Sequence, residues 1–297
     1  TDPFLTFWGI CQSLVLLLRQ MPDVVFAKGG YGAVPVVIAA RLYGIPVLIH
    51  ESDAVAGMAN RLLGKISSRI ALAYPHAERY FSSRKTAVVG IPIREEILRG
   101  DKERARKRYR LRDDLPTVLV LGGSQGARAL NEATVSALPK LLARTQVIHQ
   151  TGTENYRAVV AAAAKEGIKA GRDRYFPTSF LSAEEMGDAL ALADIVISRA
   201  GAGAIAEIAA CQKAAILVPL DISANDHQRM NAYEVAKIGG ALVLEEANLG
   251  APMLAGKIFE ILDDVRLKTS MEKNISVFFN PRAAEVIADG LSELVSD

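Results

Sequence analysis

Short apolar runs rich in β-branched residues alternate with longer helical patterns along most of the chain. In its first part, apolar runs occupy residues 24–28, 47–50, 70–73 and 87–89, and helical patterns occupy 33–43 and 56–67. This alternation predicts βαβ units, in which helices cover a parallel sheet. Because ligands of open parallel sheets bind beyond the carboxyl ends of the strands, we expect the chemistry in the loops that follow strands.

The same rhythm restarts after Pro116 and predicts a second sheet. Its expected strands are 117–121, 146–149, 174–180, 194–198, 214–218 and 241–245. Six parallel strands make a complete doubly wound sheet, whereas the first part shows only four and begins with a helix. We therefore expect an incomplete first domain, and a chain that is a fragment cut inside that domain.

The expected domain organisation has four parts. They are a first domain at 1–95, a charged linker helix at 96–116, a second domain at 117–280 and a C-terminal helix at 281–297. The linker is marked by the run 99–112, which carries eight Lys or Arg. This run is interpreted as a solvated helix with i,i+4 pairs, and attraction to an anionic membrane surface is the alternative.

Composition narrows the class of protein. Half of the 297 residues are hydrophobic, and the two cysteines, Cys11 and Cys211, stand far apart, as in an α/β protein of a reducing compartment. A net charge of +2 favours no nucleic-acid partner. No apolar run approaches the roughly 20 residues that a membrane-spanning helix needs.

Two glycine loops of the second part follow predicted strands and precede helices. The first contains Gly122, Gly123, Ser124, Gln125 and Gly126, and lacks the Gly-Lys-Ser/Thr of a P-loop. A helix start near Ala127 offers free N–H groups and a positive dipole end to an anion. This loop predicts an anion site, with a merely tight turn as the alternative.

The second glycine loop is Gly201-x-Gly203-x-x-Ala206, with Asp221 where a dinucleotide fingerprint has its acid. Glu207 is the one charge in the apolar helix that follows, so it needs a partner. Neutralisation by Arg199 is one possibility, and hydrogen bonds to a ribose diol are the other. An NAD enzyme is the less favoured interpretation, because three strands of the same domain precede this loop.

Further polar residues follow strands or open helices. Gln228 and Asn231 lie on one helix face, which suits either a cleft wall or capping chemistry. In the first part Tyr31 stands in a glycine loop, and His50 and Glu51 end a strand. His50 and Glu51 form either an acid/base or hydroxyl-binding pair, or a structural one. No Asp-x-Asp or H-E-x-x-H occurs, so no metal site and no cofactor is predicted.

Two doubly wound units with nucleotide loops in the second resemble the GT-B glycosyltransferase architecture. The motifs "GGYGAVPVVIAARLYGIPVLIHES", "GIPIREEI", "LGGSQGARALN", "VIHQTG", "DIVISRAGAGAIAEIAA" and "PLDISANDHQRMNA", in this order, resemble the MurG family. The resemblance implies an α/β fold of two facing Rossmann-like domains, the first incomplete. It also implies an inverting, metal-independent transfer of N-acetylglucosamine from UDP-N-acetylglucosamine to the 4-hydroxyl of the N-acetylmuramic acid of undecaprenyl-linked lipid I.

Site residues follow from the resemblance residue by residue. Leu181 would hold the uracil, Glu207 the ribose, and Gln228 and Asn231 the sugar. The leaving diphosphate would meet Ser124, Gln125, Arg94 and the segment Gly201, Ala202, Gly203, Ala204, Ile205 and Ala206. Tyr31, His50, Glu51 and Asn60 would line the acceptor side, where a base takes the proton, and Asp53 would lie near the sugar.

Departures from the family pattern qualify these roles. Ser52 and Asp53 replace the usual Gln and Asn, and the family's glycine loop with its candidate base histidine is expected upstream of Thr1. The opening helix, with Phe4, Phe7 and Trp8, matches the family's membrane-contacting region and implies a peripheral protein on the cytoplasmic side of the bacterial inner membrane. A UDP-N-acetylglucosamine 2-epimerase and an inactive UDP-sugar-binding fragment are the alternatives.

Overall fold

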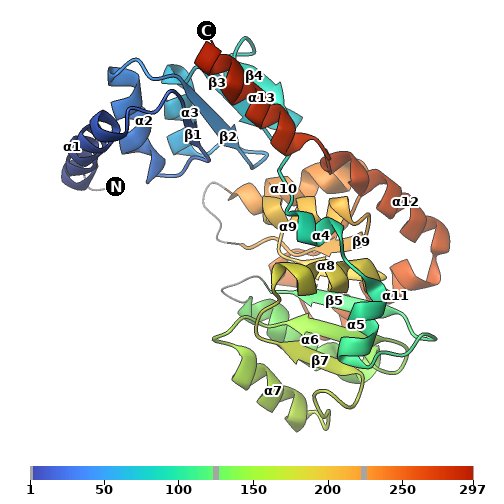
Figure 1. The fold of residues 1–297 in the computed structure, drawn as a ribbon. Coiled ribbons are helices and arrows are strands. Elements are labelled where there is room, and N and C mark those ends of the chain that lie inside the picture. Colours follow the sequence, from blue (N-terminus) through green and yellow to red (C-terminus); the bar gives the residue numbers. More distant parts are fainter. Residues whose placement is uncertain (1–2, 123–126, 222–225, 297) are drawn as a thin grey trace. The chain divides into compact units, whose positions relative to one another are not determined.

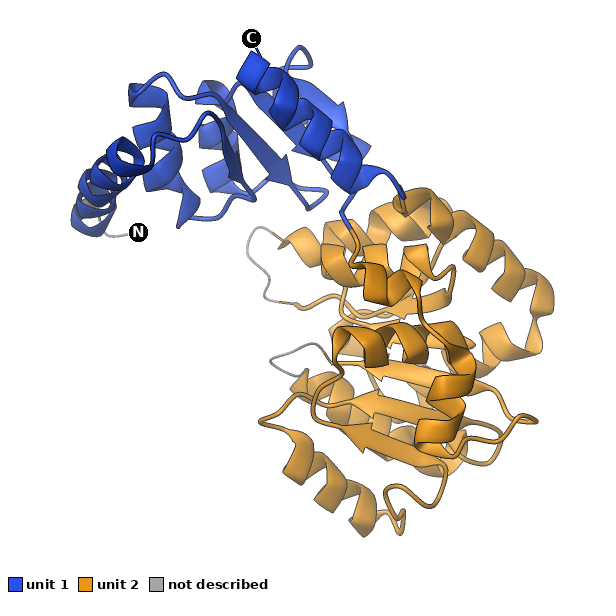
Figure 2. Cartoon of the chain, in the orientation of Figure 1, with its two compact units in different colours: residues 1–92, 280–297 blue, residues 93–279 orange. Residues whose placement is uncertain are grey.

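The computed structural model describes residues 3–122, 127–221 and 226–296, which form α/β elements throughout (Figure 1). The chain divides into two compact units (Figure 2). Unit 1 comprises Thr1–Pro92 and Asn280–Asp297, and unit 2 comprises Ile93–Phe279. The C-terminal segment thus belongs to the same compact unit as the N-terminal strands.

Unit 1 contains a parallel sheet in the order β1-β2-β3-β4. The strands are β1 (Val25–Ala27), β2 (Val47–Glu51), β3 (Arg69–Leu72) and β4 (Thr86–Val88). All neighbouring pairs are parallel, which confirms the four strands predicted from the apolar runs.

Helices cover both faces of this sheet because side chains alternate along each strand. The helices of unit 1 are α1 (Pro3–Gln20), α2 (Ala33–Leu42), α3 (Met58–Ile66), η1 (Pro75–Tyr80) and α13 (Ala283–Ser296). Val47 and Ile49 of β2 pack into the core that includes α2 and α3. Leu48, between them, packs instead with Ile287 of α13. The last helix therefore completes the second face of the first sheet.

Unit 2 contains a six-stranded parallel sheet in the order β10-β9-β8-β5-β6-β7. The strands are β5 (Thr117–Leu121), β6 (Gln146–Gln150), β7 (Tyr175–Thr178), β8 (Ile195–Ser198), β9 (Ala214–Leu217) and β10 (Leu242–Val243). All six predicted strands are present and parallel. The strand order reverses between β5 and β8, and ligands of doubly wound sheets bind at such a switch point.

The helices of unit 2 also form two layers. They are α4 (Glu95–Leu98), α5 (Lys102–Tyr109), α6 (Arg128–Leu141), α7 (Tyr156–Lys165), α8 (Ala183–Leu192), α9 (Ala202–Ala210), α10 (His227–Lys237), η3 (Glu246–Asn248), α11 (Ala251–Asp263), α12 (Val265–Ile275) and η4 (Ser276–Phe278). Val118 and Val120 of β5 pack with α6 and α11, whereas Leu119 and Leu121 pack with α8 and α9.

The basic run 99–112 forms α5 and its flanks within unit 2. Most of its charged side chains are exposed, as expected for a solvated helix. Arg104 anchors it, because its guanidinium contacts the buried carboxylate of Asp188 on α8 at 2.7 Å. Asp101 caps the helix by accepting from the Glu103 N–H at 2.7 Å.

Candidate active site

The turn between β8 and α9 lies at the carboxyl edge of the second sheet, next to the switch point. Gly201 caps α9 with φ −69° and ψ 138°, an ordinary conformation for any residue. A Cβ atom at Gly201 or Gly203 would meet no described atom within 4 Å. The first N–H groups of a helix have no acceptor within the helix, and among the described residues the positions of Gly201 and Gly203 leave room for a ligand, so the first turn of α9 suits an anion.

The rest of the predicted segment 201–206 faces the other way. The side chains of Ala202, Ile205 and Ala206 are buried in the core, and Ala204 is half-buried. Only their backbone is therefore placed to contribute to a site at the start of the helix.

Glu207 pairs with an arginine that the sequence interpretation had assigned to the diphosphate. Arg94 Nη2 lies 3.1 Å from Glu207 Oε1, and the two side chains are 59% and 21% exposed. Arg199 contacts Glu246 instead, at 2.6 Å, so the interpretation in which Arg199 neutralises Glu207 is wrong. Arg94 and Glu207 together form a half-exposed charged pair, and Glu207 lies one helical turn after Gly203 on α9.

Of the β5–α6 loop, Ser124 and Gln125 lie outside the described residues. Gly122, which opens the loop, is packed tightly: a Cβ atom there would lie 3.0 Å from the Gln150 carbonyl oxygen and 3.2 Å from the Ala127 nitrogen. A side chain at this position would force the strand end and the helix start apart. Gly122 therefore serves close packing between them.

A buried polar chain beneath this loop was missed from the sequence. Asn131 of α6 donates to the Thr151 carbonyl at 2.9 Å, and its Oδ1 lies 3.0 Å from His149 Nε2. His149 Nδ1 lies 3.0 Å from the Tyr175 hydroxyl. Complete burial lowers the pKa of His149 to about 3, so the ring is neutral at physiological pH. These hydrogen bonds hold the start of α6 against β6 and β7. His149 and Asn131 appear in the motifs "VIHQTG" and "GARALN", but neither motif indicates that the two side chains contact each other.

Leu181 follows β7 and precedes α8. Its side chain is buried in the core, so only its backbone is available for the predicted uracil contact. The preceding Phe180 is 56% exposed, and its carbonyl accepts from the Thr178 hydroxyl at 3.0 Å. Ser182 and Glu185 then form a capping box at the start of α8. The turn that carries Leu181 is thus held at both ends.

Gln228 and Asn231 occupy the first turns of α10, as predicted, but in different environments. Gln228 Oε1 accepts from the Leu220 N–H at 3.2 Å and the residue is half-buried. Asn231 is completely buried and its amide donates to the Ala200 carbonyl at 3.2 Å. Asp226 precedes the helix in a left-handed conformation with no capping bond from its side chain. Asn231 therefore holds the residue before Gly201, and Gln228 remains the more accessible of the two amides.

In unit 1 the predicted acceptor-side residues form a buried cluster with one exposed member. The Glu51 carboxylate accepts from the N–H groups of Asp53 at 3.0 Å and Gly57 at 3.1 Å, and from the Asn60 amide at 2.9 Å. Gly29 has φ +88°, and a Cβ atom there would collide with the Asn60 amide. Tyr31, on the same turn, is 55% exposed. Asn60 thus connects the turn that presents Tyr31 to Glu51.

His50 and Glu51 do not share partners. His50 Nε2 lies 2.9 Å from the Gly90 carbonyl oxygen, a contact in which only the ring nitrogen can donate. Burial lowers the pKa of His50 and raises the pKa of Glu51. His50 is therefore neutral, and its buried Nδ1, like Asn60 Oδ1, has no hydrogen-bond partner among the described residues. Both atoms are buried acceptors, and the Asn60 amide lies against Gly29 in the Tyr31 turn.

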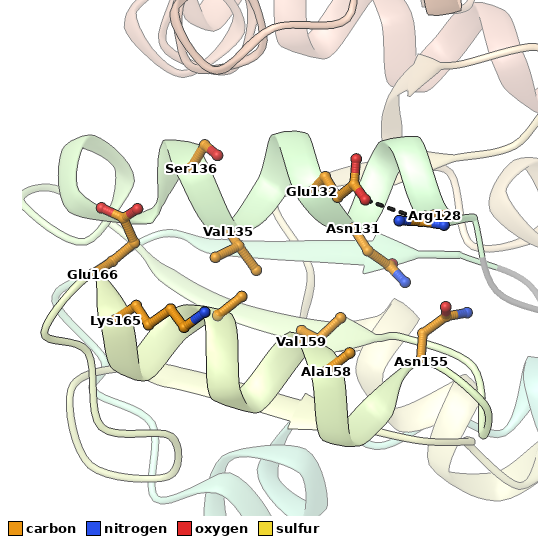
Figure 3. Close-up of a pocket in the computed structure, with 11 residues that line it drawn as sticks. Arg128, Asn131, Glu132, Val135, Ser136, Asn155, Ala158, Val159, Lys165 and Glu166 are labelled. Atoms are coloured by element: carbon orange, nitrogen blue, oxygen red, sulfur yellow. Dashed lines mark hydrogen bonds and ion pairs between the residues drawn. The ribbon is translucent and has the colours of Figure 1, made fainter.

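Within the described ranges, no group of three or more His, Cys, Asp and Glu side chains is arranged to hold a metal ion. None of the helices that the structure describes is long and apolar enough to cross a membrane. A surface cavity of about 510 Å³ lies between α6 and α7 (Figure 3). Its floor is formed by Val135, Ala158 and Val159, and none of the predicted site residues lines it.

Comparison with known proteins identifies relatives over the whole chain. The profile of the glycosyltransferase family 28 N-terminal domain matches residues 1–72, and that of the C-terminal domain matches residues 117–287. The two parallel α/β units with these matches confirm the GT-B fold class.

Two curated relatives carry the same name, UDP-N-acetylglucosamine–N-acetylmuramyl-(pentapeptide) pyrophosphoryl-undecaprenol N-acetylglucosamine transferase. The protein of Thermodesulfovibrio yellowstonii is 41% identical over 94% of this chain and 78% of its own length. That of Clostridium perfringens is 35% identical over 99% of this chain and 77% of its own.

Solved structures with a similar fold include a member of the same family as these relatives. The crystal structure of Acinetobacter baumannii MurG has a TM-score of 0.79 at 31% identity, over 99% of this chain and 80% of that one. A UDP-GlcNAc 2-epimerase of Neisseria meningitidis, bound to UDP-GlcNAc, has a TM-score of 0.72 at 11% identity, over 97% of this chain and 81% of that one. The second likeness concerns the fold alone.

Proposed function

The chain belongs to the MurG family of N-acetylglucosamine transferases, and on this premise we propose that it moves N-acetylglucosamine from UDP-N-acetylglucosamine to lipid I. The acceptor is the 4-hydroxyl of N-acetylmuramic acid on an undecaprenyl diphosphate carrier. The product is lipid II, the precursor of peptidoglycan. UDP leaves as the new bond forms with inversion at the anomeric carbon.

The observation that carries the proposal is the first turn of α9 with the charged pair behind it. The N–H groups at the helix start, and the room that the described residues leave at Gly201 and Gly203, suit the diphosphate. Negative charge on the diphosphate grows as the sugar departs, and the helix terminus and the exposed Arg94 guanidinium are donors suited to stabilise it. Glu207 accepts hydrogen bonds from the ribose diol, and the Leu181 backbone pairs with the uracil.

Unit 1 takes the acceptor in this proposal. Tyr31 is the exposed group of its cluster and is the side chain suited to meet a sugar hydroxyl, whereas the acceptor atoms His50 Nδ1 and Asn60 Oδ1, unpaired within the described part of the chain, are buried. Glu51 already accepts three hydrogen bonds, so its role is to hold the loop around it. Asp53 donates its backbone N–H to Glu51, and its side chain is placed on the same loop.

Membrane contact in the proposal involves α1. Phe4, Phe7, Trp8 and Leu18 of this helix are each more than half exposed. Large apolar side chains on one amphipathic helix favour insertion into the headgroup region of a bilayer. The protein would bind peripherally to the cytoplasmic face of the bacterial inner membrane. Sedimentation with anionic vesicles, comparing wild type with Trp8→Ser, tests this part of the proposal.

Incubation with UDP-N-acetylglucosamine and lipid I tests the transfer directly. We expect a disaccharide lipid and free UDP in equal amounts. Release of a free 2-epimeric sugar would favour an epimerase, and calorimetric binding of the UDP-sugar without any transfer would favour a binding protein. Binding of NAD in place of the UDP-sugar would overturn the nucleotide assignment.

A further inference from the structure

Arg199 makes more contacts at the carboxyl edge of the second sheet than a surface arginine would. Its Nη1 donates to Glu246 Oε2 at 2.6 Å and to the carbonyls of Val218 and Pro219 at 3.3 Å each. The Arg199 and Glu246 side chains are only 13% and 23% exposed. Arg199 follows β8, Val218 and Pro219 follow β9, and Glu246 follows β10. One guanidinium therefore ties together the ends of three neighbouring strands.

The residue after Arg199 is fixed from another direction. Its carbonyl, that of Ala200, accepts from the buried amide of Asn231 on α10. Gly201 comes next and opens α9. The short connection from β8 to α9 is thus held by a side chain at its first residue and by a backbone contact at its second, immediately before the N–H groups assigned to the diphosphate.

We propose that Arg199 and Glu246 are positioning residues of the nucleotide-sugar site, and that they hold the β8–α9 turn in the orientation that presents these N–H groups. This inference rests on the proposed function. The charge of Arg199 is compensated by Glu246 and by two carbonyls, so Arg199 acts through the turn and not on the diphosphate. Arg94, which pairs with Glu207 but is 59% exposed, is the guanidinium that the proposed function assigns to the ligand.

An electrostatic reason supports a positioning pair here. A guanidinium left without its carboxylate near the carboxyl edge would attract the diphosphate toward itself and away from the helix start. A carboxylate left without its guanidinium would repel it. In the pair, Arg199 Nη1 holds the strand ends, and the Glu246 carboxylate cancels the charge of the guanidinium, so the helix terminus determines where the anion binds.

The variants Arg199→Met and Glu246→Gln test this role. Their KM and kcat are measured for both substrates, and their affinity for UDP is measured by calorimetry. We expect each variant to raise the KM for UDP-N-acetylglucosamine and the Kd for UDP by about tenfold or more, the scale on which supporting residues act. The KM for lipid I should stay at the wild-type value. Arg199→Lys keeps a charge that reaches Glu246, and should fall between wild type and Arg199→Met.

Arg144→Met is the matched control, because Arg144 pairs with Asp263 in the same unit but precedes β6, at the amino edge of the sheet. It should leave both KM values unchanged. If folded Arg199→Met and Glu246→Gln bound UDP with the wild-type Kd, the positioning role would be overturned. The same would hold if kcat, both KM values and the UDP affinity all worsened only in proportion to the amount of unfolded protein. Failure of the wild type to bind UDP-N-acetylglucosamine would instead overturn the proposed function.

Discussion

Replacing Asn60 with alanine tests whether Glu51 is a structural anchor. Asn60 and Glu51 are 4% and 3% exposed, and the amide donates to the carboxylate at 2.9 Å. A hydrogen bond to a charged group contributes about 1.5–3 kcal/mol. We expect Asn60→Ala to lower the free energy of unfolding of unit 1 by that amount at pH 8.

The loss should depend on pH with a defined sign. Burial raises the pKa of Glu51, and the Asn60 amide is one of the donors that oppose this rise. Its removal raises the pKa further, so the cost is full where Glu51 is ionised and shrinks as pH falls through the raised pKa. Trp8 is the single tryptophan of the chain and lies in unit 1, so its fluorescence in urea reports this unit.

Asn280→Ala is the matched control in the same unit. Its amide donates to the neutral Val89 carbonyl at 2.8 Å, so its loss should cost about 0.5–1.5 kcal/mol at any pH. If Asn60→Ala showed the same small loss at pH 8 and at pH 5, the carboxylate would not depend on the amide. The reasoning about Glu51 would then be refuted.

Three further outcomes are expected in unit 2. Glu207→Ala should weaken UDP-N-acetylglucosamine binding by about 1.5–3 kcal/mol in calorimetry, and unchanged affinity in a folded variant would contradict the ribose role. Gly203→Ala should stabilise α9 by about 0.5–1 kcal/mol yet weaken UDP binding, whereas equal affinity would show that no ligand approaches there. Because the pKa of His149 is lowered to about 3 from 6.5, stability should be lost as pH falls between these values. His149→Gln should flatten this acid slope by about 1.4 kcal/mol per pH unit, and an unchanged slope would count against the buried neutral ring.

The sheets were predictable because buried parallel strands are continuous apolar runs. The prediction was less accurate at the edges of the second sheet. Residues 174–180 and 241–245 were expected as strands, and β7 and β10 span only Tyr175–Thr178 and Leu242–Val243. Both are edge strands, which pair on one side only, and β7 contains Pro177, which an edge tolerates. Apolar runs do not indicate how many neighbours a strand has.

The position of the glycine loops after strands was also predictable from the alternation of strands and helices, but the partners of charged side chains were not. Arg94 and Glu207 are 113 residues apart, and Arg199 and Glu246 are 47 apart. Arg199 was the alternative partner considered for Glu207, because the two are close in sequence. Such pairs depend on the register of neighbouring strands and on where each strand ends. The spacing of residues within one motif does not determine either.

The adjacency of His50 and Glu51 misleads for a related reason. Successive side chains of a strand point to opposite faces of its sheet, so neighbours in sequence are poorly placed to act as an acid/base pair. His50 accordingly contacts Gly90, whereas Glu51 contacts the loop that leads to Asn60. β2 is an interior strand, which explains why both are buried. Adjacency in sequence along a strand therefore does not indicate that two side chains act together.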